Sequence, residues 1–365
     1  MKEAPVSNGI RAQRERLGIS QSALARRVGL SRQALHSVET SRSVPSVRVS
    51  LALARALESP VERLFWLPRE PERVHVRAVG RGPAGDAPER VLLGAVDRRL
   101  VAHVLDAADA TPADGLGLHR PGGAMEVELF PGSRWQDRLF LAGCDPALGL
   151  LAHKVGGGAH WIDVPSDEAL AMLARHQAHV AGLHLAGDRS GGGNVRAVRR
   201  RCPGRRMLLV HFATWELGFG VPAGNPLRIR DVRSLARPRV RLINRPATAG
   251  ARHLLDRLLR RARISSSRVD GYDSTAPGHE GVALAVSVGG ADVGITTRAA
   301  AGAHGLEFIP LSVERFDLAL TAGTAEGAPA RRLLDVLRSP SLRRELGALP
   351  GYDAARTGDV VAEVG

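Results

Sequence analysis

The spacing of apolar residues changes twice along this 365-residue chain. Over residues 8–66, apolar side chains recur three and four positions apart, which predicts five short helices. Residues 69–137 hold short β-like runs on either side of the turn-rich stretch 81–88. From residue 139 onward, short apolar runs alternate with amphipathic segments, which is typical of βα units around a mostly parallel sheet. The pattern therefore predicts a helical domain, a connecting region and an α/β domain.

The second and third predicted helices, within residues 20–39, are joined by a tight turn. Ser20 and Ser31 occupy the positions just before each helix, where a serine side chain can accept a hydrogen bond from a free backbone N–H group. Gly29 lies where the first of these helices must end, because glycine tolerates the left-handed conformation common at helix C-termini. The apolar positions of the next helix leave a polar face, which consists of Arg32, Gln33, His36 and Ser37.

The order of caps, turn and helices over residues 7–67 resembles the lambda-repressor-like, or Xre-type, DNA-binding domain. The resemblance implies that the third helix enters the major groove, where Arg32 and Gln33 contact guanine and adenine edges. It also implies that Gln21 braces this helix and contacts a phosphate, while the loop after the helix contacts the DNA backbone. The predicted DNA-binding residues are Gln21, Arg32, Gln33, His36, Ser37, Arg42 and Ser43.

The charge of the chain fits a nucleic-acid partner. Residues 1–60 contain ten Lys and Arg against four Asp and Glu, so this segment carries +6 of the formal +14. Basic charge of this size gives sequence-independent affinity for phosphates, and that affinity falls steeply with salt. Lys2 and Lys154 are the only lysines, so part of the arginine excess can reflect coding bias rather than function.

Membrane segments, disulfides and metal motifs are not visible in the sequence. No run of eighteen apolar residues and no hydrophobic N-terminal signal occur, so we expect a cytoplasmic protein that does not contact a membrane. Cys144 and Cys202 are the only cysteines, which excludes a disulfide framework and an all-cysteine metal site. His176 and His179 could share one helical face, but they lack a third ligand. We therefore expect neither a metal nor a cofactor.

Four ordered segments of the α/β region resemble a cytoplasmic domain related to periplasmic molybdate-binding proteins. They lie at residues 141–151, 244–259, 278–295 and 308–318. This periplasmic-binding-protein-like domain spans residues 138–350 and is found fused to helix-turn-helix domains in bacterial regulators. The resemblance implies a one-component transcription factor in which a ligand closes two lobes and closure changes DNA binding. It also implies a homodimer that binds a palindromic site in double-stranded DNA.

Two loops of this domain are candidates for the ligand pocket. In open α/β sheets, ligands bind beyond the carboxyl ends of strands, where loops meet helix N-termini. Loops 143–146 and 248–252 occupy such places and offer backbone N–H groups suited to an oxyanion or a carboxylate. Relatives usually show G-S-G-T-R in the second loop, whereas this chain has T-A-G-A-R, which weakens the argument for molybdate or tungstate. Asp145 could instead cap the following helix. The predicted ligand-binding residues are Cys144, Asp145, Thr248, Gly250, Arg252, Tyr272 and Thr275.

The predicted fold is multidomain, with an all-α helix-turn-helix domain followed by an α/β two-lobed periplasmic-binding-protein-like domain. The predicted boundaries are 1–68 for the DNA-binding domain, 69–137 for a linker with short β-hairpins, 138–350 for the ligand-sensing domain and 351–365 for a loose tail. The predicted function is transcription regulation in response to a small oxyanion or a small organic ligand, without catalysis.

Two alternative functions stay open at this point. The first is an α/β enzyme with an attached DNA-binding module, in which Cys144 pairs with His153 or His160. An enzyme of this kind needs a nucleophile and a base that share one group of loops. The second alternative is a pair of lobes that no longer binds ligand and serves for dimerisation.

Overall fold

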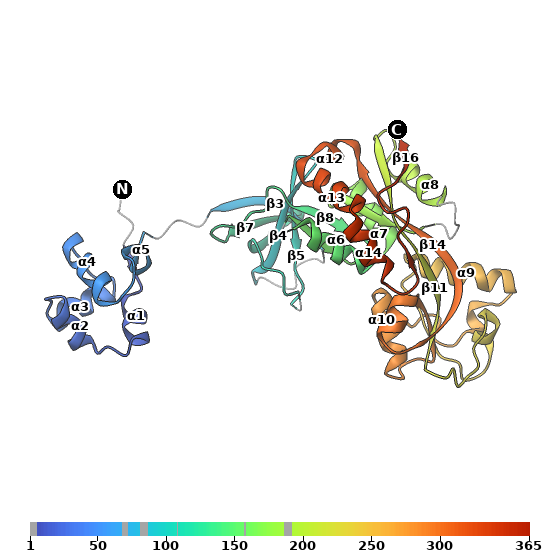
Figure 1. Cartoon of the computed structure of the whole chain (residues 1–365), viewed down its shortest axis with the longest axis horizontal. Coiled ribbons are helices and arrows are strands. Elements are labelled where there is room, and N and C mark those ends of the chain that lie inside the picture. Colours follow the sequence, from blue (N-terminus) through green and yellow to red (C-terminus); the bar gives the residue numbers. More distant parts are fainter. Residues whose placement is uncertain (1–5, 68–71, 81–86, 108, 157, 186–191) are drawn as a thin grey trace. The chain divides into compact units, whose positions relative to one another are not determined.

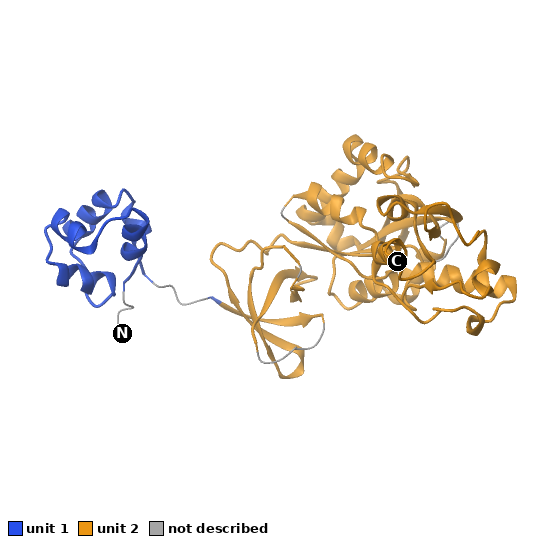
Figure 2. Ribbon diagram, turned by 90° about the horizontal axis from the view of Figure 1, so that it is seen from below, with its two compact units in different colours: residues 1–72 blue, residues 73–365 orange. Residues whose placement is uncertain are grey.

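The computed structural model describes residues 6–67, 72–80, 87–107, 109–156, 158–185 and 192–365. The chain forms two compact units, Met1–Glu72 and Arg73–Gly365, which Figure 2 shows in two colours. Most of the predicted break at residues 81–88, namely residues 81–86, lies outside the described part of the chain.

The first unit is a bundle of five short helices. Ser20, Ser31 and Ser46 cap the second, third and fourth helices, and each side chain accepts a hydrogen bond from a backbone N–H three residues later. The bounds are Ile10–Arg16 (α1), Gln21–Arg27 (α2), Arg32–Glu39 (α3), Val47–Ala56 (α4) and Val61–Leu64 (α5). Beyond α5, β2 (Phe65–Trp66) pairs with β1 (Ser7–Asn8), so a strand replaces the last predicted helical residues.

The core of this unit is formed by the apolar residues that the sequence pattern places on the inner side of each helix. Ile10, Leu24, Leu35, Leu53 and Leu57 are completely buried. Burial of one such side chain contributes about 1.5 to 3 kcal/mol, and all five belong to one cluster that joins the helices of the bundle. The bundle therefore presents the polar side of α3 on a rigid support.

The region predicted as a linker with hairpins is a closed five-stranded barrel instead. Its strands are Arg73–Val79 (β3), Glu89–Val96 (β4), Arg99–Val104 (β5), Gly115–Arg120 (β6) and Ala124–Leu129 (β7). They are paired in the order β3-β5-β4-β6-β7, and β3 also pairs with β7 to close the ring. The linker prediction is wrong because closure depends on pairs between distant strands, which a local pattern does not reveal. A 3-10 turn, Pro121–Gly123 (η1), joins β6 to β7.

The barrel is continuous with the α/β region rather than separate from it. Leu92 and Val101 from the barrel belong to the same buried cluster as Phe140 and Leu183 from the α/β region. This shared core explains why the second compact unit begins at Arg73 and not near residue 138.

A nine-stranded sheet organises the α/β region, with the order β12-β13-β11-β14-β10-β8-β9 and with β15 and β16 paired to β11. The strands are Leu139–Ala142 (β8), Ala159–Ile162 (β9), Val180–Leu183 (β10), Met207–Val221 (β11), Leu242–Ile243 (β12), Val293–Thr297 (β13), Glu307–Thr321 (β14), Tyr352–Asp353 (β15) and Val360–Val364 (β16). Strand β8 is parallel to β9 and β10, and β12 is parallel to β13. Every pair that involves β11 or β14 is antiparallel, so the sheet is mixed and not mostly parallel as expected.

Two lobes are built on this sheet, and the 15-residue strands β11 and β14 run through both. The helices of the first lobe are Ala147–Val155 (α6), Ser166–Ala174 (α7), Gly192–Arg201 (α8), Ala322–Glu326 (α12), Ala328–Arg338 (α13) and Pro340–Gly347 (α14). Those of the second lobe are Val232–Ala236 (η2), Gly250–Ala262 (α9), Ser266–Arg268 (η3), Gly278–Ser287 (α10) and Arg298–Ala303 (α11). Figure 1 shows α9 and α10 at one end of β11 and β14, and α6, α7 and α13 at the other.

The predicted loose tail is ordered, which corrects the sequence analysis. Strand β16 pairs with the first part of β11, and β15 pairs with Thr214 and Trp215. Between them, Thr357 is completely buried and donates a hydrogen bond to the backbone oxygen of Phe212 at 2.7 Å. The buried backbone groups of β11 need hydrogen-bond partners, and the tail supplies them. The tail is therefore ordered by the sheet, although its polar composition predicts a loose segment.

No helix among the described residues has both the length and the apolar character needed to span a lipid bilayer.

Candidate functional site

The first candidate site is the outer side of α3 in the helix-turn-helix unit. Leu35 and Val38 are buried against the bundle, whereas Arg32, Gln33 and His36 are exposed. Ser37 is half-buried. The predicted base-contacting side chains therefore lie on the solvent side of one helix, as a major-groove reader requires.

Gln21 links α2 to α3 through a set of hydrogen bonds. Its Oε1 accepts from Nε of Arg32 at 3.2 Å, and its Nε2 donates to Oε2 of Glu39 at 2.9 Å. Glu39 in turn accepts from Nε of Arg14 at 2.7 Å. His36 Nδ1 lies 3.5 Å from the same Gln21 Nε2. Gln21 thus braces α3 against α2 and holds the side chain of Arg32.

Arg42 and Ser43 lie in the turn that follows α3, and both are exposed. Their backbone N–H groups donate to the carbonyl oxygen of Ser37, at 2.8 Å and 3.2 Å. These two bonds fix the turn while leaving both side chains free. The arrangement suits contacts with the phosphate backbone, which position a protein on DNA without reading its sequence.

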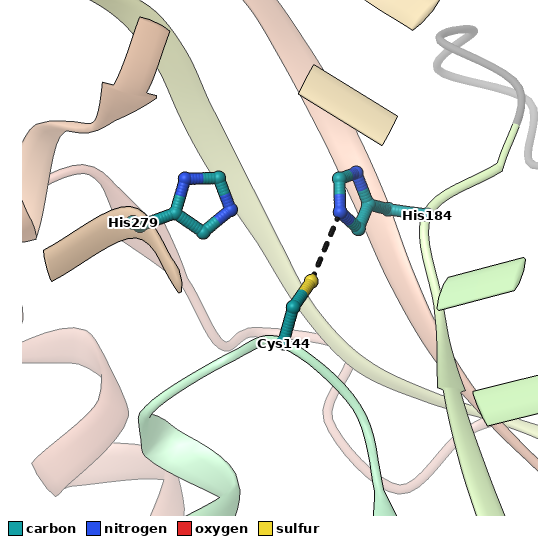
Figure 3. Close-up of side chains that lie close together, drawn as sticks. All are labelled: Cys144, His184 and His279. Atoms are coloured by element: carbon teal, nitrogen blue, oxygen red, sulfur yellow. Dashed lines mark hydrogen bonds between the residues drawn. The ribbon is translucent and has the colours of Figure 1, made fainter. Parts of the chain in front are cut away.

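The second candidate site lies between the two lobes and is centred on Cys144, His184 and His279 (Figure 3). Cys144 lies between β8 and α6, and His184 directly follows β10, so both come from the first lobe. His279 is in the first turn of α10 and comes from the second lobe. All three are buried, and their ligand atoms lie within 4.8 Å of one another.

A chain of hydrogen bonds leads from Cys144 to β14. Cys144 Sγ lies 3.2 Å from Nε2 of His184, and Nδ1 of His184 lies 3.1 Å from Oε2 of Glu314. Burial lowers the pKa of His184, but the sulfur of Cys144 and the carboxylate of Glu314 outweigh this effect and raise the pKa to about 10. Glu314 is itself buried, and its other oxygen lies 3.8 Å from Arg257 Nη2.

Several buried side-chain nitrogens around this cluster have no hydrogen-bond partner among the described residues. They are Nε and Nη1 of Arg245, both ring nitrogens of His279 and Nε1 of Trp215. Burial and the positive charges of Arg245 and His184 hold the pKa of His279 well below its ordinary value, so this ring is neutral. Trp215 packs edge-on against both histidines, with ring centroids 5.2 Å from His184 and 5.3 Å from His279. Unpaired buried donors cost about 1 to 3 kcal/mol each, which points to a bound partner at this place.

Asp145 is completely buried beside Cys144. Its Oδ1 accepts hydrogen bonds from the backbone N–H of Ala147 at 2.9 Å and from the hydroxyl of Tyr352 at 2.6 Å. Burial raises the pKa of Asp145 to about 6, against the opposing effect of these two bonds. The contact with Ala147 is the helix-capping role left open above, while Oδ2 has no partner among the described residues.

The other predicted pocket residues fall into two groups. Gly250 lies at the site, because a Cβ at this position would stand 2.5 Å from Nδ1 of His184. Thr248 and Thr275 are exposed and are not in contact with the buried cluster through any hydrogen bond of the described residues.

Arg252 and Tyr272 are held together by a network of contacts within the protein. Arg252 Nε donates to Asp256 at 3.2 Å, and its Nη1 lies 3.4 Å from the carbonyl oxygens of Arg245 and Tyr272. Its guanidinium also covers the ring of Tyr272 at 3.9 Å, and the Tyr272 hydroxyl donates to Asp256 at 2.7 Å. These contacts fix the loop of Arg245 and leave the Arg252 guanidinium engaged with the protein.

Sequence reasoning missed five residues that surround Cys144, namely His184, Trp215, Arg245, His279 and Glu314. The enzyme alternative paired Cys144 with His153 or His160, but its partner is His184. A usable signal was present for two of the missed residues, since His184 and Arg245 follow apolar strands closely, where an inward polar side chain is expected to face the ligand. Trp215 and Glu314 lie inside long strands and gave no such signal.

Comparison with known proteins agrees with this division of the chain. The model of the PBP superfamily domain matches residues 149–338, and a helix-turn-helix model matches residues 10–64. The Bacillus subtilis protein YvgK is 32% identical over 198 residues, which cover 54% of this chain and 64% of YvgK. The HTH-type transcriptional regulator YgzD of the same organism is 34% identical over 65 residues, which cover 18% of this chain and 98% of YgzD. A phosphate transport receptor from Vibrio cholerae has a TM-score of 0.41 with 14% identity, covering 59% of this chain and 99% of the receptor.

Proposed function

Because the chain belongs to the PBP superfamily and joins that domain to a helix-turn-helix domain, we propose that it is a transcription regulator that senses a small oxyanion between its lobes. The observation that carries the proposal is the buried guanidinium of Arg245, whose Nε and Nη1 lack partners among the described residues. Buried guanidinium N–H groups without hydrogen-bond partners are unfavourable, and the carboxylate of Asp163 acts on the charge of Arg245 without bonding either group, so an anion would complete the site. We also propose that the regulator acts in the cytoplasm, where a DNA-binding protein meets the chromosome.

The chemistry of the surrounding groups favours an oxyanion over a cationic or apolar effector. Arg245, Trp215 and one ring nitrogen of His279 offer N–H donors, and each can bind an oxygen of a compact anion. Molybdate and tungstate carry four such oxygens, and so do sulfate and phosphate. Small carboxylates also carry a negative charge on oxygen atoms, so they are the organic ligands that fit the same donors.

Ligand binding is expected to close the two lobes, because each lobe supplies part of the site. Cys144 and His184 come from the first lobe, and Arg245 and His279 come from the second, so an occupant held by both sets of groups favours the closed state. The lobes are joined through β11 and β14, and β11 has register shifts between His211 and Ala213 and between Leu217 and Gly218. Irregular positions of this kind can absorb a hinge motion. The ligand shifts DNA binding only by its preference for the closed lobes.

On DNA, we propose that two copies of the chain bind a palindromic operator. In this arrangement Arg32 and Gln33 read base edges, and Gln21, Arg42 and Ser43 contact phosphates, with His36 and Ser37 at the same surface. The second copy has a candidate contact on α4 and the turn before it, where the apolar side chains Val44, Val47 and Leu51 are 66%, 77% and 58% exposed. Sedimentation of the full chain with Leu51→Glu as a comparison tests this contact.

The function itself is tested by a ligand screen on the full chain. Thermal-shift measurements with molybdate, tungstate, sulfate, phosphate and small carboxylates identify the effector. DNA selected from a random pool then gives an operator whose affinity is measured with and without the effector. We expect one anion to raise the melting temperature and to change operator affinity by severalfold or more. An anion that binds without any effect on DNA affinity contradicts the regulatory proposal.

A second candidate function, thiol-dependent catalysis, is favoured by one observation. Cys144, His184 and Glu314 form the nucleophile, base and orienting acid of a hydrolase-like chain. However, Cys144 is only 2% exposed, so a substrate reaches the sulfur only if the lobes open. The test is acylation of Cys144 by activated esters. A Cys144-dependent burst of product supports catalysis, and no burst supports a binding site.

A further inference from the structure

We propose that the Cys144 thiolate and the imidazoles of His184 and His279 bind one thiophilic transition-metal ion, for which Zn²⁺ is the test ion. This proposal goes beyond anion sensing, because the three metal ligands do not include Arg245, which carries the proposed oxyanion site. Thiolate and imidazole are the donors preferred by zinc and by its neighbours in the transition series. No metal-binding motif marks these ligands in the sequence, since the three residues are spread over residues 144–279.

The ligand atoms are already close to the separation that a metal requires. Around a tetrahedral zinc ion, with Zn–S of about 2.3 Å and Zn–N of about 2.0 Å, sulfur and nitrogen ligands are separated by about 3.5 Å. Cys144 Sγ lies 3.2 Å from Nε2 of His184, and the ligand atoms of all three residues fall within 4.8 Å. Side-chain rotations that move the ligand atoms by a few tenths of an ångström to about 1 Å therefore bring all three atoms into one tetrahedral coordination sphere. The fourth position of this sphere stays open.

Glu314 supports the metal-binding form of His184. Oε2 of Glu314 accepts the hydrogen bond from Nδ1 of His184 at 3.1 Å, which leaves Nε2 to face Cys144. Carboxylate–histidine–metal arrangements of this type fix both the tautomer and the orientation of a ligand ring. When the ion binds, it forms bonds to Cys144 Sγ and to Nε2 of His184, and the proton held between these two atoms is released to solvent.

His279 supplies an independent observation. The side chain is 1% exposed, and neither of its ring nitrogens has a hydrogen-bond partner among the described residues. A neutral imidazole in this state is costly to bury and ready to donate a lone pair. Coordination satisfies one nitrogen, and the other remains an N–H donor toward the space beside Arg245.

The surroundings make this place dry. Trp215 lies edge-on to both histidines, and Phe316 stacks on His184 with ring centroids 5.9 Å apart. A shell of aromatic rings excludes water and strengthens the metal–ligand interactions. One thiolate and one divalent ion leave a charge of +1 at the centre, next to the guanidinium of Arg245. The open position is therefore suited to an anion, which relates the metal to the proposed effector.

The metal is tested on the full chain without a polyhistidine tag, after treatment with a chelator and under a thiol reductant. Competition with a chromophoric chelator measures the affinity and the stoichiometry for Zn²⁺, and Co²⁺ reports sulfur ligation through its thiolate charge-transfer band. We expect one equivalent of Zn²⁺ per chain and a charge-transfer band that Cys144→Ser abolishes. Cys202→Ser is the matched control, because the other free cysteine is also buried, and it keeps both signals.

Two further variants separate coordination from folding. His279→Gln is expected to lower the affinity for Zn²⁺ at least tenfold while its thermal melt stays cooperative. Glu314→Gln is expected to weaken binding by about 10- to 100-fold and to retain the charge-transfer band, as for a positioning residue. No stoichiometric binding by the wild type, or full binding by Cys144→Ser, overturns the proposal. Oxyanion thermal shifts on the metal-free chain test the proposed function separately, so failure of one does not imply failure of the other.

Discussion

The hydroxyl of Tyr352 donates a hydrogen bond of 2.6 Å to Oδ1 of Asp145, although 207 residues separate them in the sequence. Asp145 is completely buried and precedes α6, directly after Cys144. The C-terminal segment thus holds the loop that carries Cys144. Burial and the neighbouring Asp145 raise the pKa of Tyr352 well above its ordinary value, so the hydroxyl keeps its proton and remains a donor.

Tyr352→Phe is expected to lower the free energy of unfolding by about 1 to 3 kcal/mol, because it leaves a buried carboxyl oxygen with one partner fewer. Chemical denaturation of the full chain, followed by tryptophan fluorescence, measures this change. Tyr272→Phe is the matched control, since its hydroxyl donates to Asp256, which is only partly buried. A loss in Tyr352→Phe no larger than in the control would show that the tail does not stabilise the loop.

Local chemistry explains why the helix-turn-helix unit was predictable from sequence. Ser20 and Ser31 cap their helices, and Gly29 takes a φ of 71° at the end of α2, so each signal acts within a few residues of its position. The barrel and the tail depend on other segments instead. Strand β3 closes the ring by pairing with β7, and β16 is ordered by pairing with β11. A single sequence carries no direct signal for such distant pairs.

The same distinction applies to the inter-lobe site. Cys144 and Asp145 were predicted because they follow a strand and precede a helix, which is a local rule. Glu314 and Trp215 belong to the site because two long strands bring them beside His184. No local sequence motif predicts this contact. Arg252 is predicted from its place at the start of a helix, and its side chain donates to Asp256, whereas Nε and Nη1 of Arg245 have no hydrogen-bond partner among the described residues.

Gly250→Ala adds only one methyl group, but it is expected to weaken both anion binding at the inter-lobe site and the stability of the fold. A Cβ at this position would stand 2.5 Å from Nδ1 and 2.8 Å from the carbonyl oxygen of His184, so the ring or the start of α9 must move. We expect weaker anion binding, by about tenfold or more, and a destabilisation of about 1 to 3 kcal/mol. Calorimetric titration and thermal melts measure the two effects.

Gly302→Ala is the control for that variant. It also replaces a helical glycine by alanine, but nothing lies within 4 Å of the added Cβ. Alanine in a helix is favoured by up to about 1 kcal/mol, so this variant is expected to be neutral or slightly stabilised with unchanged ligand affinity. Equal behaviour of the two variants would refute a special role of the contact with His184.

Arg245→Met and Arg252→Met are expected to change stability in opposite directions. The guanidinium of Arg245 is buried with unpaired nitrogens, so an apolar replacement raises the melting temperature of the ligand-free protein and abolishes the thermal shift caused by the anion. Arg252 donates to Asp256 and to two carbonyl oxygens, so its replacement lowers the melting temperature. Retention of the anion-induced shift in Arg245→Met would remove this residue from the binding site.

Gln33→Ala is expected to weaken binding to the selected operator by about 1 to 3 kcal/mol and to leave binding to random DNA nearly unchanged. Arg32→Ala is expected to abolish operator selectivity and to leave ligand affinity intact, because Arg32 belongs to the separate helical unit. Arg11→Ala is the control, since this exposed residue of α1 pairs with Glu15. Fluorescence anisotropy measures the affinity for the selected operator and for random DNA, and the ratio of the two affinities gives the selectivity. Full selectivity in Arg32→Ala would exclude α3 as the reader.

His103 makes the contact between the barrel and the first lobe sensitive to pH. The ring is buried, its Nε2 donates to the carbonyl oxygen of Gln177 at 2.7 Å, and its centroid lies 4.1 Å from that of Phe140. Burial lowers the pKa of His103 to about 4, against the opposing hydrogen bond to Gln177, and the charges of His160 and His179 act in the same direction as burial. The folded protein therefore holds a neutral ring at pH values where the unfolded chain is already protonated.

The sign of the pH effect follows from this difference in proton binding. Below about pH 6.5 the unfolded chain binds a proton that the folded chain refuses, so the contribution of His103 is complete above that pH and is lost as the pH falls toward 4. The lowered pKa of His103 corresponds to roughly 3 kcal/mol over this window. His103→Gln keeps an N–H donor for Gln177 but cannot titrate, so the wild type should lose stability relative to this variant between pH 6.5 and 4.5. His75→Gln, at an exposed position of β3, is the control in the same pH series of melts. Parallel curves for the wild type and His103→Gln would mean that the ring is solvated, and therefore that the barrel does not pack on the first lobe through this contact.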